Sequence, residues 1–174
     1  MAPRREFLVP VTNLAQRGPK HVERRGPIPG LAVSASRVPD RAEVVVEAEL
    51  EPVHGGIMVT ATVEAPWEGE CRRCLGRAEG ALAVEVRELY ERHSSGEETY
   101  PFDGDQLDLE PLARDAVLLE LPQAPLCFEG CLGLCPSCGA DLNRSPCQCP
   151  PPSDPRWATL DSLRSQPGAG PADR

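Results

Sequence analysis

Eight cysteines are the residues of this 174-residue chain best suited to chemistry, and they fall into two clusters. The first cluster is a CxxC pair and the second is packed into 23 positions; the members are Cys71 and Cys74, then Cys127, Cys131, Cys135, Cys138, Cys147 and Cys149. Thiolates are soft metal ligands, and zinc takes four of them in a tetrahedron. Eight sulfurs fit two such sites, so the sequence predicts two structural zinc ions rather than a lone catalytic nucleophile.

The spacing favours one division of the eight sulfurs. The run Cys135-Pro-Ser-Cys138 followed by Gly139 has the form of a zinc knuckle, because glycine permits the left-handed backbone that such a turn often needs. The preferred ligand sets are Cys71, Cys74, Cys127 and Cys131, and Cys135, Cys138, Cys147 and Cys149. Two other divisions stay open: one site could take Cys127, Cys131, Cys135 and Cys138, or the two CxxC pairs could share an ion.

Disulfides and redox chemistry are the competing uses of these thiols. A disulfide framework needs an oxidising compartment, and secretion normally needs a signal peptide. The N-terminal sequence MAPRREFLVPVTNLAQRGPK lacks an apolar run of that kind, and no segment approaches the ~20 apolar residues of a membrane span. We therefore expect a cytoplasmic protein with reduced thiols. A redox CxxC would open a helix after a strand, whereas the first pair here is flanked by strand-like sequence.

Charge is distributed unevenly along the chain, whose formal net charge is −9. Residues 1–41 hold eight basic and three acidic residues, and residues 42–174 hold ten basic and 24 acidic ones. The acidic part should repel bulk nucleic acid, so an RNA contact would have to use the basic N-terminal arm or the arginines beside the first CxxC pair. The candidates are Arg4, Arg5, Arg24, Arg25, Arg72 and Arg73, which could equally be solvated surface charges.

Two runs with a period of two residues predict a hairpin in an antiparallel sheet with one polar face. The apolar positions are Val44, Val46, Ala48 and Leu50, then Ile57, Val59, Ala61, Val63 and Ala65. His54, Gly55 and Gly56 between the runs suit a tight turn. A third alternating run contains Leu82, Val84 and Val86. It places the first CxxC pair in the turn of a second hairpin.

The remaining segments are shorter or less regular. EFLVPV is expected to begin one or two short strands within residues 4–25, around a loop at Gly18-Pro19. Residues 91–106 are polar and expected to form a mobile loop. A helix is predicted over residues 109–120, capped by Asp108 and stopped by Pro122, with an inward stripe of Leu109, Leu112, Ala116 and Leu119. A short helix is predicted to start at Asp154 and Pro155, and residues 165–174 are expected to be disordered.

Together these elements predict a mainly β (α+β) fold: an antiparallel sheet or partly open barrel of hairpins, with one or two short helices and a cysteine-rich C-terminal segment held by zinc. We expect one domain over residues 1–164. Residues 1–41 would form a basic arm with the first strands, 42–122 the sheet and helix, 123–152 the zinc segment, and 153–164 the short helix.

Five segments carry a resemblance to a known family. They are EFLVPVTNL near the N-terminus, GECRRCL at 69–75, DLEPLARDAVLLELPQAPLC at 108–127, CLGLCPSCGADLN at 131–143 and DPRWATL at 154–160. The chain resembles the YceD family, the large ribosomal RNA subunit accumulation proteins, from about residue 6 to 164. Its full cysteine set is similar to that of the Gram-positive and plant-type members.

The resemblance implies a bacterial, cytoplasmic, non-enzymatic factor for the synthesis or accumulation of large-subunit ribosomal RNA, and hence for assembly of the large ribosomal subunit. It brings no catalytic residues, and it implies that the eight cysteines are zinc ligands. The expected partners are precursor large-subunit RNA and ribosomal or assembly proteins, with no membrane and no small-molecule substrate. Two other functions stay open: a zinc- or redox-responsive protein, and a protein–protein adaptor that docks through a zinc ribbon.

Overall fold

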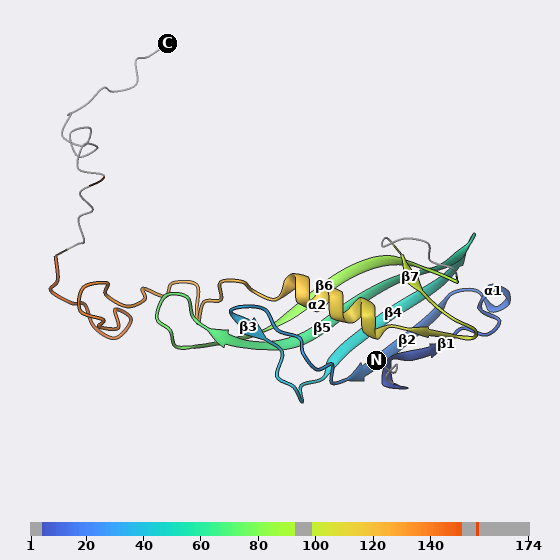
Figure 1. The fold of residues 1–174 in the computed structure, drawn as a ribbon, viewed down its shortest axis with the longest axis horizontal. Coiled ribbons are helices and arrows are strands. Elements are labelled where there is room, and N and C mark those ends of the chain that lie inside the picture. Colours follow the sequence, from blue (N-terminus) through green and yellow to red (C-terminus); the bar gives the residue numbers. More distant parts are fainter. Residues whose placement is uncertain (1–4, 93–98, 151–155, 157–174) are drawn as a thin grey trace, which may run out of the picture. The chain divides into compact units, whose positions relative to one another are not determined.

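The computed structural model describes residues 5–92, 99–150 and 156 (Figure 1). The chain forms two compact units, Met1–Cys131 and Leu132–Arg174, and each is described by itself. The single domain expected over residues 1–164 stays a prediction. The short helix expected from Asp154 lies outside the described residues except for Arg156, and the tail at 165–174 lies wholly outside them.

The first unit is built on one large twisted sheet whose strands run in the order β2-β4-β5-β6-β7, with β3 also pairing with β5 (Figure 1). All neighbours are antiparallel except β6 and β7, which are parallel. The strands are β2 (Lys20–Gly26), β3 (Ser36–Arg37), β4 (Val44–Val53), β5 (Gly56–Glu70), β6 (Arg77–Glu91) and β7 (Tyr100–Pro101). Within the described residues β2 and β7 do not pair, so the predicted antiparallel sheet is confirmed in an open form and is not closed into a barrel.

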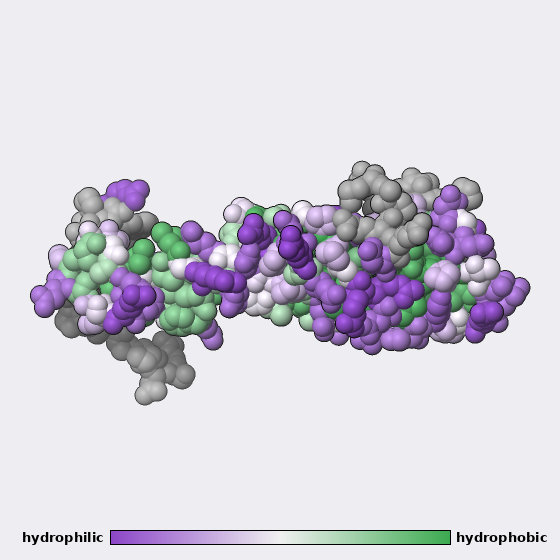
Figure 2. Space-filling view, turned by 90° about the horizontal axis from the view of Figure 1, so that it is seen from below, coloured by the Kyte–Doolittle hydropathy of each residue, from purple (hydrophilic) through white to green (hydrophobic). Residues whose placement is uncertain are grey.

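The alternation predicted for the central hairpin is confirmed. All nine apolar positions named for β4 and β5 are buried, and the turn falls at His54 and Gly55. Their neighbours in the sequence are mostly glutamate and threonine on the opposite face. Because side chains alternate between the faces of a strand, the pattern settles which face meets the core. Hydrophilic residues cover much of this unit on the face seen in Figure 2.

Helix α2 (Glu110–Glu120) covers the apolar face of the sheet and packs on β5 and β6 (Figure 1). Its buried side chains include Leu112, Ala113, Ala116 and Val117. The helix starts one residue later than predicted: Leu109 is the N-cap, while the Asp108 carboxylate accepts a hydrogen bond from the Glu110 N–H over 2.9 Å.

Leu119 was assigned wrongly to the inward stripe of this helix. Its side chain is 86% exposed. At about 100° per residue, Leu119 lies roughly 90° from the centre of the arc formed by the buried positions 112, 113, 116 and 117. It also stands in the last turn, just before Leu121 and Pro122 end the helix. The inward stripe is therefore centred between Ala113 and Ala116.

The N-terminal segment contains more than the expected strands. A 3₁₀ turn, η1 (Arg5–Phe7), precedes β1 (Leu8–Pro10), and a short helix, α1 (Leu14–Arg17), separates β1 from β2. Asn13 adopts a left-handed conformation at the start of α1, and Leu14 is buried. A four-residue helix with one buried side chain has no apolar periodicity from which it could be predicted.

The segment expected as a loop at 91–106 is partly ordered. Tyr100 in β7 lies opposite Tyr90 in β6, and their rings stack with centroids 5.2 Å apart. Strand β8 (Gln106–Asp108) then pairs with β1 in a separate two-stranded sheet. Residues 93–98 lie outside the described residues. None of the described helices is long and apolar enough to cross a membrane.

Candidate metal centres

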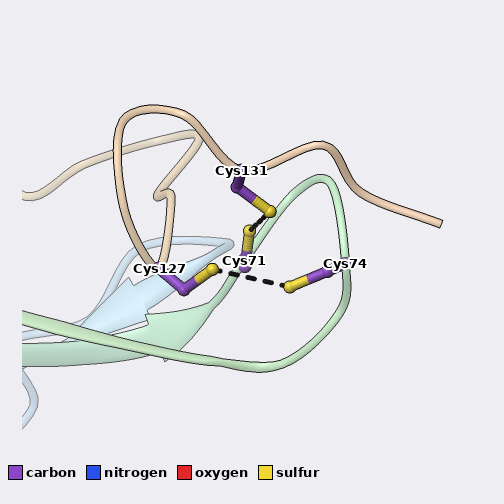
Figure 3. Close-up of side chains that lie close together, drawn as sticks. All are labelled: Cys71, Cys74, Cys127 and Cys131. Atoms are coloured by element: carbon purple, nitrogen blue, oxygen red, sulfur yellow. Dashed lines mark hydrogen bonds between the residues drawn. The ribbon is translucent and has the colours of Figure 1, made fainter. Parts of the chain in front are cut away.

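The first cysteine group lies at the end of the β5–β6 hairpin. The last paired residues of the two strands are Glu70 and Arg77, so Cys71 and Cys74 fall in the turn between them, as predicted. Cys127 and Cys131 come from the segment that follows α2. Figure 3 shows the four side chains pointing toward one another from these two loops.

The sulfur positions of this group suit a tetrahedral metal ion. The Cys71 and Cys131 sulfurs are 3.8 Å apart, those of Cys74 and Cys127 are 3.6 Å apart, and all four lie within 4.8 Å of one another. Four thiolates at about 2.3 Å from a zinc ion are separated by about 3.8 Å along each edge of the tetrahedron. A disulfide would bring two sulfurs to about 2.05 Å. None of these four cysteines forms a disulfide, and together they could hold one metal ion.

Backbone hydrogen bonds fix the turn that presents Cys71 and Cys74. The Leu75 N–H donates to the Cys71 carbonyl over 2.9 Å, and the Cys71 N–H donates to the Gly76 carbonyl over 2.7 Å. Two bonds then join the turn to the other ligand loop. The Arg72 N–H donates to the Pro125 carbonyl over 2.9 Å, and the Arg73 guanidinium Nη1 donates to the Cys131 carbonyl over 2.7 Å.

A small apolar cluster surrounds these sulfurs. Cys71, Cys131 and Ala78 are buried together, with Trp67 and Leu126 packed against them. Burial raises the pKa of the Cys71 thiol, but hydrogen bonds from the backbone N–H groups of Cys74, Cys127 and Arg73 outweigh it and lower that pKa to about 6. Burial raises the pKa of Cys127 to about 12. A bound cation would hold both groups as thiolates.

The second cysteine group lies within the second unit. The sulfurs of its four members also lie within 4.8 Å of one another: Cys135, Cys138, Cys147 and Cys149. The first pair sits in a knuckle turn closed by a hydrogen bond from the Gly139 N–H to the Cys135 carbonyl over 2.8 Å. Backbone N–H groups of Cys138 and Ser137 point at the Cys135 sulfur and lower its pKa to about 6. The turn thus favours a thiolate, which is the form that binds metal.

A polar turn supports this second group. The Asp141 carboxylate accepts the Asn143 N–H over 2.9 Å, and the Asn143 side-chain oxygen accepts the Leu132 N–H over 2.7 Å. The sequence analysis did not identify Asp141 or Asn143 as a residue that supports the second cysteine group. The pattern Asp-Leu-Asn after the knuckle could have indicated the first of these bonds, because Asx turns bond two residues onward. The long-range bond to Leu132 leaves no such local signal.

Two of the candidate arginines of the N-terminal arm, Arg24 and Arg25, have partners within the protein. Arg4 lies outside the described residues, and so does the side chain of Arg5. Arg24 donates to a carbonyl of β1 over 3.2 Å and to the Glu23 carbonyl over 2.8 Å. Arg25 forms an ion pair with the Glu23 carboxylate. The structure therefore gives Arg24 and Arg25 partners within the protein, and an RNA contact by the arm stays a prediction.

The two arginines of the CRRC turn differ from each other. Arg73 is committed to the Cys131 carbonyl, so its first role is to join the two ligand loops. Arg72 is exposed and has no side-chain hydrogen bond or ion pair to any residue that the structure describes. The sequence alone could not separate them, because the difference depends on a contact 58 residues away.

These features define a mainly β protein with an open sheet and two groups of four cysteines, each of which could hold a metal ion. The family model of the large ribosomal RNA subunit accumulation protein YceD matches residues 59–164, a segment that contains all eight cysteines. The chain belongs to the YceD family.

Individual relatives agree with this assignment. An uncharacterized protein of Mycobacterium tuberculosis is 41% identical over 122 residues, which cover 66% of this chain and 59% of that protein. An uncharacterized protein of Mycobacterium leprae is 34% identical over 130 residues, covering 70% of this chain and 59% of that protein. The chloroplastic large ribosomal RNA subunit accumulation protein YCED homolog 1 of Arabidopsis thaliana is 34% identical over 68 residues, covering 38% of this chain and 21% of the homolog.

The chain thus spans about three fifths of the length of the mycobacterial relatives it matches. No solved structure matches it.

Proposed function

We propose that this protein is a non-enzymatic factor for the accumulation of large-subunit ribosomal RNA and for assembly of the large ribosomal subunit. The observation that carries the proposal is the YceD family match over residues 59–164, together with the names of the family and of its chloroplastic member. Its proposed partners are precursor large-subunit RNA and ribosomal or assembly proteins, and its proposed location is the cytoplasm of a bacterium.

The buried polar groups favour a factor that binds rather than one that catalyses. Among the described residues two polar side chains are buried, Ser36 and Glu110. The Ser36 hydroxyl donates a hydrogen bond to the Pro122 carbonyl oxygen over 2.8 Å. The Glu110 carboxylate forms an ion pair with the Arg114 guanidinium, with 3.0 Å between oxygen and nitrogen. Ser36 therefore joins β3 to the loop after α2, whereas the Glu110 pair lies within α2 and holds Arg114, whose other guanidinium nitrogen donates to the Pro29 carbonyl over 3.0 Å. General acid–base catalysis needs a group poised over an accessible site, and neither is placed in that way.

Zinc has a structural part in this proposal. Each group of four cysteines would hold one ion, in the sets Cys71, Cys74, Cys127 and Cys131, and Cys135, Cys138, Cys147 and Cys149. All-thiolate, four-coordinate sites are typical of structural zinc, which leaves no position open for a substrate. The first ion would join the β5–β6 turn to the segment after α2. Metal binding would then contribute directly to folding, which suits a chain with only 4% aromatic residues.

The test is depletion of the protein in its own cells, followed by a sucrose-gradient profile and probing for precursor large-subunit RNA. We expect fewer large subunits or a build-up of unprocessed precursor. Complementation with a Cys71→Ser chain should fail, while the unchanged chain restores the profile. A normal profile after depletion, in rich growth and under stress, would contradict the proposed function.

A further inference from the structure

The two knuckle turns of this chain have the same backbone hydrogen bonds but carry different residues after their second cysteine. In the first, the Leu75 N–H bonds the Cys71 carbonyl and the Cys71 N–H bonds the Gly76 carbonyl, over 2.9 and 2.7 Å. In the second, Gly139 and Ala140 make the equivalent bonds with Cys135, both over 2.8 Å. The residue after the second cysteine is left-handed in both turns, with φ of 58° at Leu75 and 72° at Gly139.

Leucine is an unfavourable residue at this position for two reasons. A left-handed backbone is strained for a residue with a Cβ, whereas glycine adopts it freely. The Leu75 side chain is also 59% exposed, so burial within the described residues does not offset the strain. Strained residues that packing does not explain are found preferentially at binding and active sites. Leu75 therefore points to a contact made outside the chain.

A second exposed apolar side chain lies on the other loop of the same cysteine group. Phe128 is 52% exposed and directly follows Cys127, whose sulfur is 3.6 Å from that of Cys74, the residue before Leu75. Leu75 and Phe128 thus directly follow ligand cysteines on the two loops that carry this group. Arg72, on the same turn, is exposed and has no side-chain partner among the described residues. We call Arg72, Leu75 and Phe128 the knuckle tip.

Charge indicates which partner would meet the knuckle tip. The polar face of the sheet carries an excess of exposed glutamates, including Glu47, Glu49, Glu64 and Glu85, and it should repel a polyanion. The knuckle tip combines an available guanidinium with an exposed aromatic ring. Single-stranded nucleic acid is bound by this combination, because unpaired bases stack on aromatic side chains while arginine meets the phosphates.

We propose that the knuckle tip binds a single-stranded segment of RNA, with a base stacked on Phe128, apolar contact from Leu75 and a phosphate held by Arg72. The inference rests on the proposed function, since it names the surface through which the protein would reach ribosomal RNA. It gives the first cysteine group a second purpose: joining the two loops on which these exposed side chains stand.

The test uses the full chain loaded with zinc and a set of short single-stranded RNAs tiled across the large-subunit ribosomal RNA. Phe128→Ser should weaken binding of the best tile by about ten- to hundredfold. Arg72→Ser should reduce the slope of log affinity against log salt by about one. Leu75→Gly should weaken binding severalfold while keeping the fold, because the second knuckle already uses glycine there. The controls are Arg87→Ser, at an exposed arginine of β6, and Val53→Ser, at the other end of the sheet; both should bind normally.

Several results would overturn the inference. Undiminished tile binding by Phe128→Ser and Arg72→Ser would place the RNA contact elsewhere and leave the proposed function intact. A second such result is that the variants keep tile binding but fail to capture a ribosomal or assembly protein that the unchanged chain captures from nuclease-treated extracts. That result would make the knuckle tip a protein-docking surface. If no tile binds the unchanged chain, the inference fails, and the depletion profile decides the proposed function separately. Leu75→Gly supplies the decisive variant if Phe128→Ser does not fold.

Discussion

The guanidinium of Arg73 donates a hydrogen bond to the carbonyl oxygen of Cys131 over 2.7 Å and so joins the β5–β6 turn to the segment after α2. The bond is partly buried and links residues 58 positions apart. Hydrogen bonds from charged donors contribute about 1.5–3 kcal/mol when well shielded. We expect Arg73→Ala to lower the free energy of unfolding by about 1–2 kcal/mol, measured by urea denaturation of the zinc-loaded chain.

Arg72→Ala is the matched control for this prediction. It removes the same charge from the same turn, but the Arg72 side chain bonds no residue that the structure describes, and the backbone bond from Arg72 to Pro125 remains. Its effect should stay within about 0.5 kcal/mol. Equal losses in the two variants would show that positive charge near the sulfurs, rather than the bond to Cys131, stabilises the turn.

The two cysteine groups should lose metal independently of each other. We expect Cys131→Ser and Cys149→Ser each to bind one zinc ion where the unchanged chain binds two, measured with a colorimetric chelator after denaturation. Cys131→Ser should destabilise the chain more, because Cys131 is fully buried and its group joins segments distant in the sequence, whereas Cys149 is only half-buried in a local group. If either variant lost both ions, the division into two sites would be wrong.

The sheet was predictable because its rules are local. Alternation in β4 and β5 follows from the two-residue period of a strand, and the two-residue turn at His54 and Gly55 sets their register. The same reasoning placed Cys71 and Cys74 in the second hairpin turn. By contrast, α1 contains four residues, and the parallel pairing of Tyr100 with Tyr90 depends on tertiary packing. Neither leaves a periodic pattern to detect.

The division of the eight cysteines into two groups follows from the topology of the fold as well as from their spacing in the sequence. Spacing alone left several divisions open, since each cysteine can reach several partners along a flexible chain. The structure gathers Cys127 and Cys131 with the hairpin because Pro125 and Arg72 join the two loops. Metal ligation by these groups stays a prediction. The sequence could not predict that Arg73 bonds the Cys131 carbonyl while Arg72 does not. Two adjacent arginines differ only in their tertiary contacts, which the sequence does not reveal.

Gly139 offers a clean test of backbone strain in the second knuckle. Its φ is 72°, and a Cβ added there would meet no atom within 4 Å, so a substitution changes the backbone preference without a clash. We expect Gly139→Ala to destabilise the second group by about 1 kcal/mol, seen as faster zinc transfer to a competing chelator. Gly130→Ala, at a glycine outside the left-handed positions, is the control and should leave the transfer rate unchanged. Equal rates in Gly139→Ala and the unchanged chain would show that the turn tolerates a side chain without cost.

The two tyrosines should make the fold sensitive to alkaline pH. Burial raises the pKa of Tyr90, whose hydroxyl donates to the Asp108 carbonyl over 3.1 Å, and burial together with a hydrogen bond to Asp115 raises the pKa of Tyr100. A raised pKa in the folded state contributes stability that is fully present below the unfolded value of about 10 and is lost as pH rises above it.

The chain contains two tyrosines, so tyrosinate absorbance reports on this stacked pair alone. We expect no tyrosinate signal near pH ~10 while the chain is folded, and a signal that appears together with loss of the circular-dichroism spectrum at higher pH. Tyr90→Phe should flatten the alkaline loss of stability relative to its own value at neutral pH, because the group that ionises on unfolding is gone. Tyrosinate that forms near pH ~10 in a chain still folded would show that at least one hydroxyl of the pair is open to solvent.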